Sequence, residues 1–324
     1  MTIDQSLAAQ DIMEDIKNRK YNPLNDVLFK FIFGKEERKQ VTIDFLNAVL
    51  DRKGKHAIKD IHFRNSEIIP LFDGDKLTRL DIFCVTEKGE RIDVEVQIVN
   101  QKNMERRTLF YWAQMYLMSL GSGGLYQDLR PCITINILRY NIFPGTAAHS
   151  MYSIYNMAAK RRLSNDMELH FLEVPKFQMK PIKDMTRMER WFAYFSNKLD
   201  EKERKELAMK DIAIQTAMDA AAIFMQDSNE RLAYLNREMA IMDYESDRAM
   251  WTAEGRSAGR AEGRAEGKAE GKAEGKAEER EVGIKALISA AKTFAASPAQ
   301  AAEQLIKSYS LTEDEAQAIV KANW

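Results

Sequence analysis

The chain has 324 residues, of which 45% are hydrophobic, so it is long enough for a sizeable core and for more than one domain. Its 48 lysines and arginines nearly balance its 49 aspartates and glutamates, which excludes a globally basic nucleic-acid-binding protein and leaves only a local patch for such a partner. Two cysteines without metal-ligand spacing, no signal-like N-terminal segment and no run of membrane-span length predict a cytoplasmic protein with no membrane association.

The N-terminal third predicts two helices and a strand. Residues 1–20 are amphipathic at best and indicate a loose helix or arm. Asn25 or Asp26 can cap a helix that begins near Val27, and a second helix is predicted over residues 38–52. A strand is predicted over residues 58–71. The acids of the turn that follows, at residues 73–76, lack the ligand spacing and closing Glu of a calcium loop, so no calcium site is predicted there.

Residues 79–99 predict a β-hairpin, because two short runs rich in β-branched residues flank a polar turn that contains glycine. In the second run Asp93, Glu95 and Gln97 alternate with apolar residues, and a period of two places these three on the face opposite the core. The next segment, residues 104–120, is predicted to close over one face of the hairpin as a helix, with Asp81 and Glu95 near a shared edge. Its expected inward residues are Leu109, Trp112, Ala113, Tyr116, Leu117 and Leu120.

Two acids on paired strands suit a divalent-metal site. Mg²⁺ takes one or two carboxylates together with substrate phosphate oxygens and water. Such an ion can activate a water molecule and neutralise charge on a phosphodiester. The alternative is the ordinary solvated polar face of an amphipathic hairpin, and residue spacing alone leaves both interpretations open.

Four segments follow one another in a distinctive order and spacing: NPLNDVLFKFIFG at 22–34, DFLNAVL at 44–50, RLDI at 79–82 and DVEVQ at 93–97. Together with residues 106–112 and the turn at 124–126, they resemble the recombination-promoting nuclease / putative transposase family, a branch of the PD-(D/E)XK nuclease superfamily. The resemblance is close over roughly residues 20–145. It implies an α/β fold, a restriction-endonuclease-like core with a central mixed β-sheet flanked by helices. An all-helical C-terminal region is predicted to follow.

The resemblance also implies a metal-dependent DNA endonuclease. Asp81 and Glu95 match the two acids of the motif and would hold Mg²⁺ or Mn²⁺. Gln97 stands where the superfamily has Lys; it can orient water or bond to a phosphate oxygen, but it carries no positive charge. The negative charge that develops in the transition state would then be neutralised by the metal or by a basic residue such as Arg107.

Two further acids, Asp26 and Asp93, are candidate site residues because of their positions in the sequence. Asp26 matches an acid that some family members carry on the first core helix. Asp93 lies one pleat from Glu95 on the same predicted face, where it is either an alternative ligand or a surface acid, and the surface acid is the favoured interpretation.

Beyond the hairpin, residues 132–138 and 168–174 predict two more strands, the second at the edge of the sheet. The basic residues Lys102, Arg106 and Arg107 and the run at 160–162 form either a phosphate-contacting patch or a solvated surface. No two of the four histidines lie within a helical turn of each other, and no cysteine matches them, so no zinc site or catalytic triad is predicted.

The C-terminal part reads as helical over residues 185–251. From 259 to 278 the chain repeats Gly-(Arg/Lys)-Ala-Glu five times, and glycine every fourth residue costs about 1 kcal/mol each in a helix. A flexible charged linker is the favoured interpretation, with self-association as a bipolar helix second. Residues 282–324 predict a small helical unit with two capping boxes. Because residues 311–324 contain only one base, this unit fits a partner-binding or packing module better than a DNA-reading helix-turn-helix.

The predicted organisation is a nuclease-like domain (1–183), a helical region (184–252), a charged linker (253–281) and a helical tail (282–324). The leading hypothesis is a metal-dependent DNA endonuclease linked to recombination or mobile elements. The alternative is a catalytically inactive DNA-binding or transposition-associated protein that forms homo-oligomers through its C-terminal region.

Overall fold

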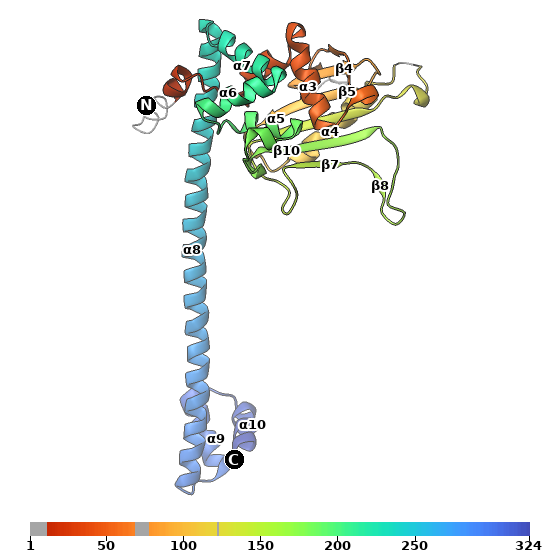
Figure 1. Ribbon diagram of the computed structural model, residues 1–324. Helices are drawn as coiled ribbons and strands as arrows, with labels where there is room; N and C mark the ends of the chain where they lie inside the picture. Colours follow the sequence, from red (N-terminus) through yellow and green to blue (C-terminus); the bar gives the residue numbers. More distant parts are fainter. Residues whose placement is uncertain (1–11, 69–77, 122) are drawn as a thin grey trace. The chain divides into compact units, whose positions relative to one another are not determined.

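The computed structural model describes residues 12–68, 78–121 and 123–324 (Figure 1). The chain divides into two compact units, Met1–Glu245 and Ser246–Trp324, and each is described by itself. The predicted turn at residues 73–76 and the first eleven residues of the predicted arm lie outside the described residues. The domain boundaries at residues 183, 252 and 281 stay predictions.

The first unit is built on a six-stranded mixed sheet in the order β1-β4-β5-β6-β10-β7. β6 is parallel to both of its neighbours, β5 and β10, and the remaining pairs are antiparallel. The expected α/β core with a mixed sheet is thus confirmed. The strands are β1 (Ile61–Phe63), β4 (Ile82–Thr86), β5 (Arg91–Gln97), β6 (Cys132–Leu138), β10 (Met167–Glu173) and β7 (His149–Tyr152).

Two predictions about strands were wrong. Where the expected strand 58–71 is described, up to residue 68, it contains only β1 and the two-residue β2 (Glu67–Ile68), which pairs with β3 (Thr78–Arg79) outside the main sheet. β10 is not an edge strand, because β7 pairs antiparallel with it and forms the edge of the sheet.

The predicted hairpin of β4 and β5 is confirmed, and Gly89 in its turn has a φ of +83°, a conformation that favours glycine.

Helices on one face of the sheet enclose the main hydrophobic core (Figure 1). The first of them begins as expected, since Asn25 accepts hydrogen bonds from the backbone N–H groups of Val27 and Leu28. At the centre of this layer, the rings of Phe33, Phe45 and Trp191 pack against one another in tilted and edge-to-face arrangements. The helices that contribute to this core include α2 (Asp26–Phe33), α3 (Lys39–Val49), α5 (Arg187–Ser196), α6 (Glu201–Lys210) and α7 (Ile212–Phe224).

The opposite face is covered by α4 (Met104–Leu117), as predicted, and the expected inward residues Trp112 and Tyr116 pack there, but the inward side of the helix is only partly the predicted one. Leu109 and Leu117, expected inside, are 46% and 64% exposed, whereas Thr108 and Met115 are buried. The reason is that the sheet is polar beneath this helix. Thr108 donates a hydrogen bond from Oγ1 to Oδ1 of Asn136 on β6 at 3.2 Å.

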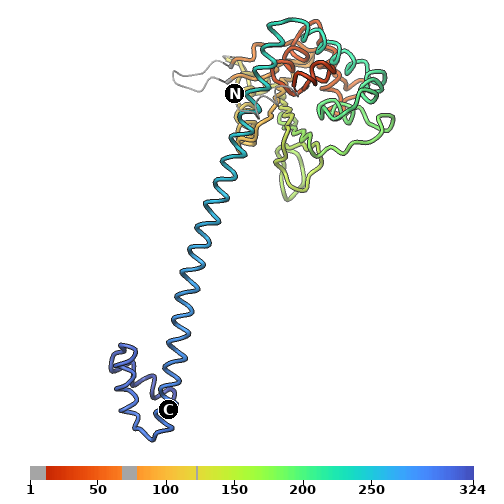
Figure 2. The backbone as a smooth tube through the Cα atoms, turned by 90° about the vertical axis from the view of Figure 1, so that its left-hand side faces the viewer, coloured from red at the N-terminus to blue at the C-terminus, as the bar shows by residue number. Residues whose placement is uncertain are grey.

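The Gly-(Arg/Lys)-Ala-Glu repeat is helical and forms part of α8 (Ser228–Thr293), so the expectation of a flexible linker was wrong (Figure 2). The repeat extends an existing helix and needs no new nucleus, and three of its four residue types are strong helix formers. Residues 246–282 are all exposed. None of the helices in the described ranges combines the length and apolar composition required to cross a membrane.

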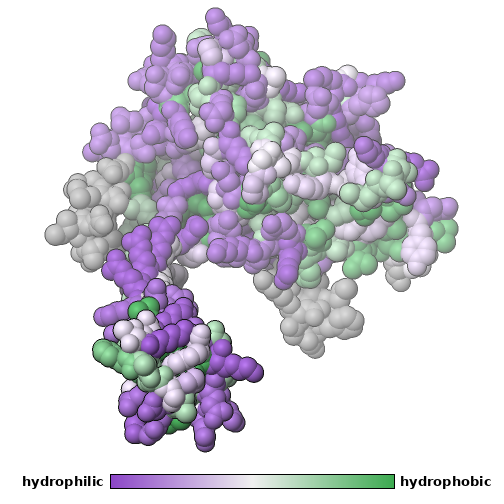
Figure 3. Space-filling model, turned by 90° about the horizontal axis from the view of Figure 1, so that it is seen from below, coloured by the Kyte–Doolittle hydropathy of each residue, from purple (hydrophilic) through white to green (hydrophobic). Residues whose placement is uncertain are grey.

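The end of the second unit is the predicted helical tail, in which α9 (Pro298–Tyr309) and α10 (Glu313–Asn323) pack against the end of α8. Both capping boxes are present, at Ser297 and at Thr312. Figure 3 shows the mainly hydrophilic surface of this unit, interrupted by a few hydrophobic side chains. Phe294, which directly follows α8, is 84% exposed.

A pair of histidines on β7 and β10 was not expected from their spacing. Nε2 of His149 lies 2.9 Å from Nδ1 of His170, and Nε2 of His170 lies 3.3 Å from Oε2 of Glu168. Burial, together with the neighbouring His170, lowers the pKa of His149 to about 4.

This pair predicts acid sensitivity. Because an unfolded His has a pKa near 6.5, the unfolded chain binds the proton first as pH falls, and the folded state loses stability between about pH 6.5 and pH 4. We expect a loss of about 2 kcal/mol from pH 7 to pH 5 by urea unfolding, and a clearly smaller loss in His149→Gln. The same change at the exposed His62 is the control. An equal loss in all three proteins would contradict this assignment.

Candidate functional site

Asp81 and Glu95 are held together by reciprocal hydrogen bonds between neighbouring strands. The backbone N–H of Asp81, just before β4, donates to Oε1 of Glu95 on β5 at 2.9 Å. The N–H of Val96 donates to Oδ2 of Asp81 at 3.0 Å. The side chain of Glu95 is 1% exposed and that of Asp81 13%. The structure thus brings together the two acids that the sequence placed at one edge, while their role stays a prediction.

A cation lies against each of the two carboxylates. Nζ of Lys30, on α2, is 2.8 Å from Oδ1 of Asp81. Nη2 of Arg107, on α4, donates to Oε2 of Glu95 at 3.0 Å. Nε2 of Gln97 approaches the same Oε2 at 3.4 Å. Two carboxylates, two cations and an amide therefore meet at one place on the sheet.

The electrostatics of this group are set mainly by burial. Burial and the charge of Asp81 raise the pKa of Glu95 to about 7, while Arg107 and the N–H of Asp81 act in the opposite direction. Arg107 also lies over the ring of Tyr111, 5.0 Å from its centroid. Arg107 is thus held between Glu95 and Tyr111, and its predicted role in neutralising transition-state charge stays a prediction.

Asp93 is fully buried, so its interpretation as a surface acid was wrong. The prediction failed because α4 covers the face of β5 on which Asp93 and Glu95 lie. Neither carboxylate oxygen of Asp93 has a hydrogen-bond partner among the described residues, and neither does Oγ1 of Thr134, its neighbour on β6. Burial, followed by the charges of Glu95 and Asp81, raises the pKa of Asp93 well above its usual range.

Replacing Asp93 by Val is expected to stabilise the fold. A buried polar group without a partner costs about 1–3 kcal/mol, and Val suits a strand. Urea unfolding at pH 7 should therefore show a gain of about this size, with a smaller gain in Thr134→Val, which removes one unpartnered hydroxyl. A loss of stability in Asp93→Val would mean that its carboxylate makes a favourable interaction in the folded chain.

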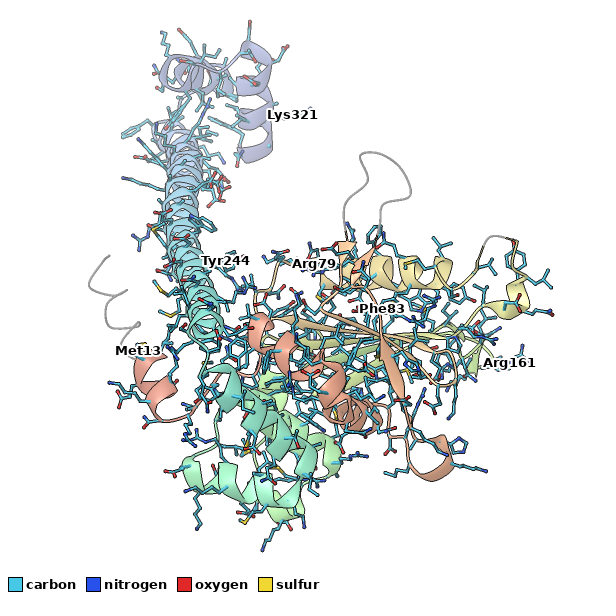
Figure 4. All side chains as sticks on the ribbon, turned by 90° about the horizontal axis from the view of Figure 1, so that it is seen from above. Met13, Arg79, Phe83, Arg161, Tyr244 and Lys321 are labelled. Atoms are coloured by element: carbon cyan, nitrogen blue, oxygen red, sulfur yellow. The ribbon has the colours of Figure 1, made fainter. Side chains whose placement is uncertain are left out.

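The other predicted residues lie apart from this group. Asp26 is engaged by Arg237, whose Nε is 2.7 Å from Oδ1 of Asp26. In the predicted basic patch, Arg162 pairs with Glu168 at 3.0 Å. Figure 4 shows Arg161, from the same run, well away from Arg79, which is two residues before Asp81. Lys102 and Arg106 are exposed.

Comparison with known families matches residues 23–250 to the PD-(D/E)XK nuclease family transposases. The chain belongs to this family. The match spans the whole sheet, α4 and the helices of the main core, so family and observed fold agree. Searches of curated proteins and of solved structures gave no match.

The chain is thus a PD-(D/E)XK family transposase, and with Asp81 and Glu95 assigned to the two acids of the motif, as the sequence predicts, Gln97 stands where the family name has Lys. The structure supplies a cation that the sequence analysis missed, because Lys30 reaches Asp81 from α2. One sign of this role was present in the sequence: Lys30 is the one basic residue of the helix that lies within the segment 22–34.

The residues present fit a hard divalent cation, since two carboxylates converge from adjacent strands of this nuclease fold. Across the described ranges, no group of three or more His, Cys, Asp or Glu residues could hold a metal. An ion at Asp81 and Glu95 would therefore take its remaining ligands from water and substrate, as Mg²⁺ commonly does.

Proposed function

We propose that this chain hydrolyses phosphodiester bonds of DNA in the cytoplasm, in a reaction that depends on Mg²⁺ or Mn²⁺ and serves recombination or mobile elements. The observation that supports this most directly is the reciprocal bonding of Asp81 and Glu95, which pairs a partly buried and a buried carboxylate on neighbouring segments of a nuclease-type sheet. Membership of the nuclease family supports DNA as the substrate.

Each residue of the group has a distinct role in this proposal. Asp81 and Glu95 would hold the ion, which when bound supplies an activated water and neutralises phosphate charge. Lys30 places a positive charge beside Asp81, where it can stabilise charge that develops on a phosphate oxygen. Gln97 and Arg107 both bond to Oε2 of Glu95 and keep its carboxylate oriented.

The test is cleavage of supercoiled plasmid by the full chain with Mg²⁺ or Mn²⁺, and with chelator as the control. Nicked and linear products that require the metal are the expected result. If no DNA is cleaved with any divalent ion, the proposal is wrong.

One observation favours a second function. Both carboxylates are already engaged by cations, Lys30 and Arg107, as they would be in a site without catalytic activity. The chain would then be a silent DNA-binding or transposition-associated protein that oligomerises through its C-terminal unit. DNA binding without cleavage, with an oligomeric mass by light scattering, would favour this second function.

A further inference from the structure

A cleft of about 350 Å³ opens beside Asp81. It lies between α2 and the strands β1 and β4, with residues that directly adjoin these strands, on the side of the sheet where β1 is the edge strand. Its charged and polar lining consists of Lys30, Lys35, Arg64, Ser66, Asp81 and Glu230. Three cations and two acids thus surround a cavity that shares Asp81 and Lys30 with the candidate site.

Two of these three cations, Lys35 and Arg64, differ from nearby lysines in that they make no ion pair with a described acid. Lys30 is paired with Asp81, and Lys39, just beyond the cleft, is paired with Asp60 at 2.7 Å. Lys35 and Arg64 are exposed and make no ion pair with any described acid. Their charges are therefore available to an anion from outside the chain.

The backbone fixes both residues close to Asp81. The N–H of Arg64 donates to the carbonyl of Phe83 at 2.9 Å, and the N–H of Leu80 donates to the carbonyl of Ser66 at 2.9 Å. These bonds tie the chain after β1 to both sides of Asp81. Lys35 follows Gly34, whose N–H closes the end of α2 on the carbonyl of Lys30.

We propose that this cleft binds the DNA backbone next to the phosphodiester that is cleaved, with Lys35 and Arg64 as its phosphate contacts and Ser66 as a hydrogen-bond donor. This inference rests on the proposed function and adds to it the path that one strand of the DNA follows across the protein surface. An almost neutral chain needs such a local cationic surface to hold nucleic acid. The path leads along the edge strand β1 and reaches Asp81 from the side of α2.

The test is the salt dependence of DNA binding by the full chain, measured by fluorescence anisotropy with a labelled duplex in EDTA, so that no cleavage occurs. Each lost phosphate contact should lower the slope of log K against log salt by about 0.9. We expect this for Lys35→Ala and for Arg64→Ala, about twice the change in the double variant, and no change in Lys55→Ala, which removes another exposed lysine. In cleavage assays the double variant should raise KM and retain kcat.

The outcomes separate the two proposals. If the wild type binds and cleaves DNA but the double variant keeps its slope and KM, the cleft assignment is wrong and the nuclease proposal stands. If the wild type neither binds nor cleaves DNA, both are wrong. Circular dichroism and thermal unfolding of each variant check that the exposed substitutions leave the fold intact.

Discussion

Asp81→Asn and Glu95→Gln are each expected to abolish metal-dependent cleavage, with a loss of at least about 100-fold in kcat, because a metal-assisted reaction draws several kcal/mol of transition-state stabilisation from the ion. Both changes keep the size of the side chain and an oxygen that accepts the cross-strand hydrogen bonds. Plasmid nicking under single-turnover conditions measures the effect.

A matched control is available at Asp51, which is 83% exposed and has a positive φ of 46°, a conformation that Asn tolerates well. Asp51→Asn makes the same chemical change away from the site and should retain full activity. Cleavage that survives both Asp81→Asn and Glu95→Gln would remove these residues from the metal site. Calorimetric titration with Mn²⁺ should show weaker binding in both variants but not in the control.

The second large effect concerns Lys30, the cation that pairs with Asp81. Lys30→Met should lower kcat by about 100-fold, the usual consequence of removing a preorganised group that stabilises transition-state charge. If Lys30 provides the charge that Gln97 lacks, adding Gln97→Lys to this variant should restore part of the activity. DNA-cleavage kinetics of the single and double variants measure both effects.

Lys39→Met is the control for Lys30→Met, because it breaks an ion pair of similar length, with Asp60, outside the cleft. Equal activity of Lys30→Met and the wild type would show that the metal alone carries the charge. No rescue by Gln97→Lys would show that position 97 does not reach the reacting phosphate.

The hairpin and its two acids could be predicted from the sequence because the information is local. A period of two and a glycine-containing turn define the pairing of β4 and β5, and this pairing brings Glu95 to Asp81. The contact of Lys30 with Asp81 could not be predicted in this way, since it joins a helix and a strand that are far apart in the sequence and depends on how α2 packs on the sheet.

The failed predictions have physical causes of the same kind. The inward face of α4 was inferred from its apolar residues, of which Trp112 and Tyr116 do pack inward. The polar face of the sheet, with Glu95 and Asn136, also draws in Arg107 and Thr108, which that inference missed. Asp93 was judged exposed because strand periodicity tells which residues share a face and not what covers that face.

The charges along α8 imply an uncommon response to ionic strength. In the repeat, acids stand four residues apart and so do bases, whereas opposite charges are two or six apart, so neighbours on the helix surface have like charge. Each such pair destabilises the helix by about 0.2–0.5 kcal/mol, and dissolved ions screen this repulsion. Added salt should therefore increase the helicity of this segment. The same salt should weaken phosphate binding at Lys35 and Arg64, so a rise in ionic strength strengthens the helix and lowers the affinity for DNA.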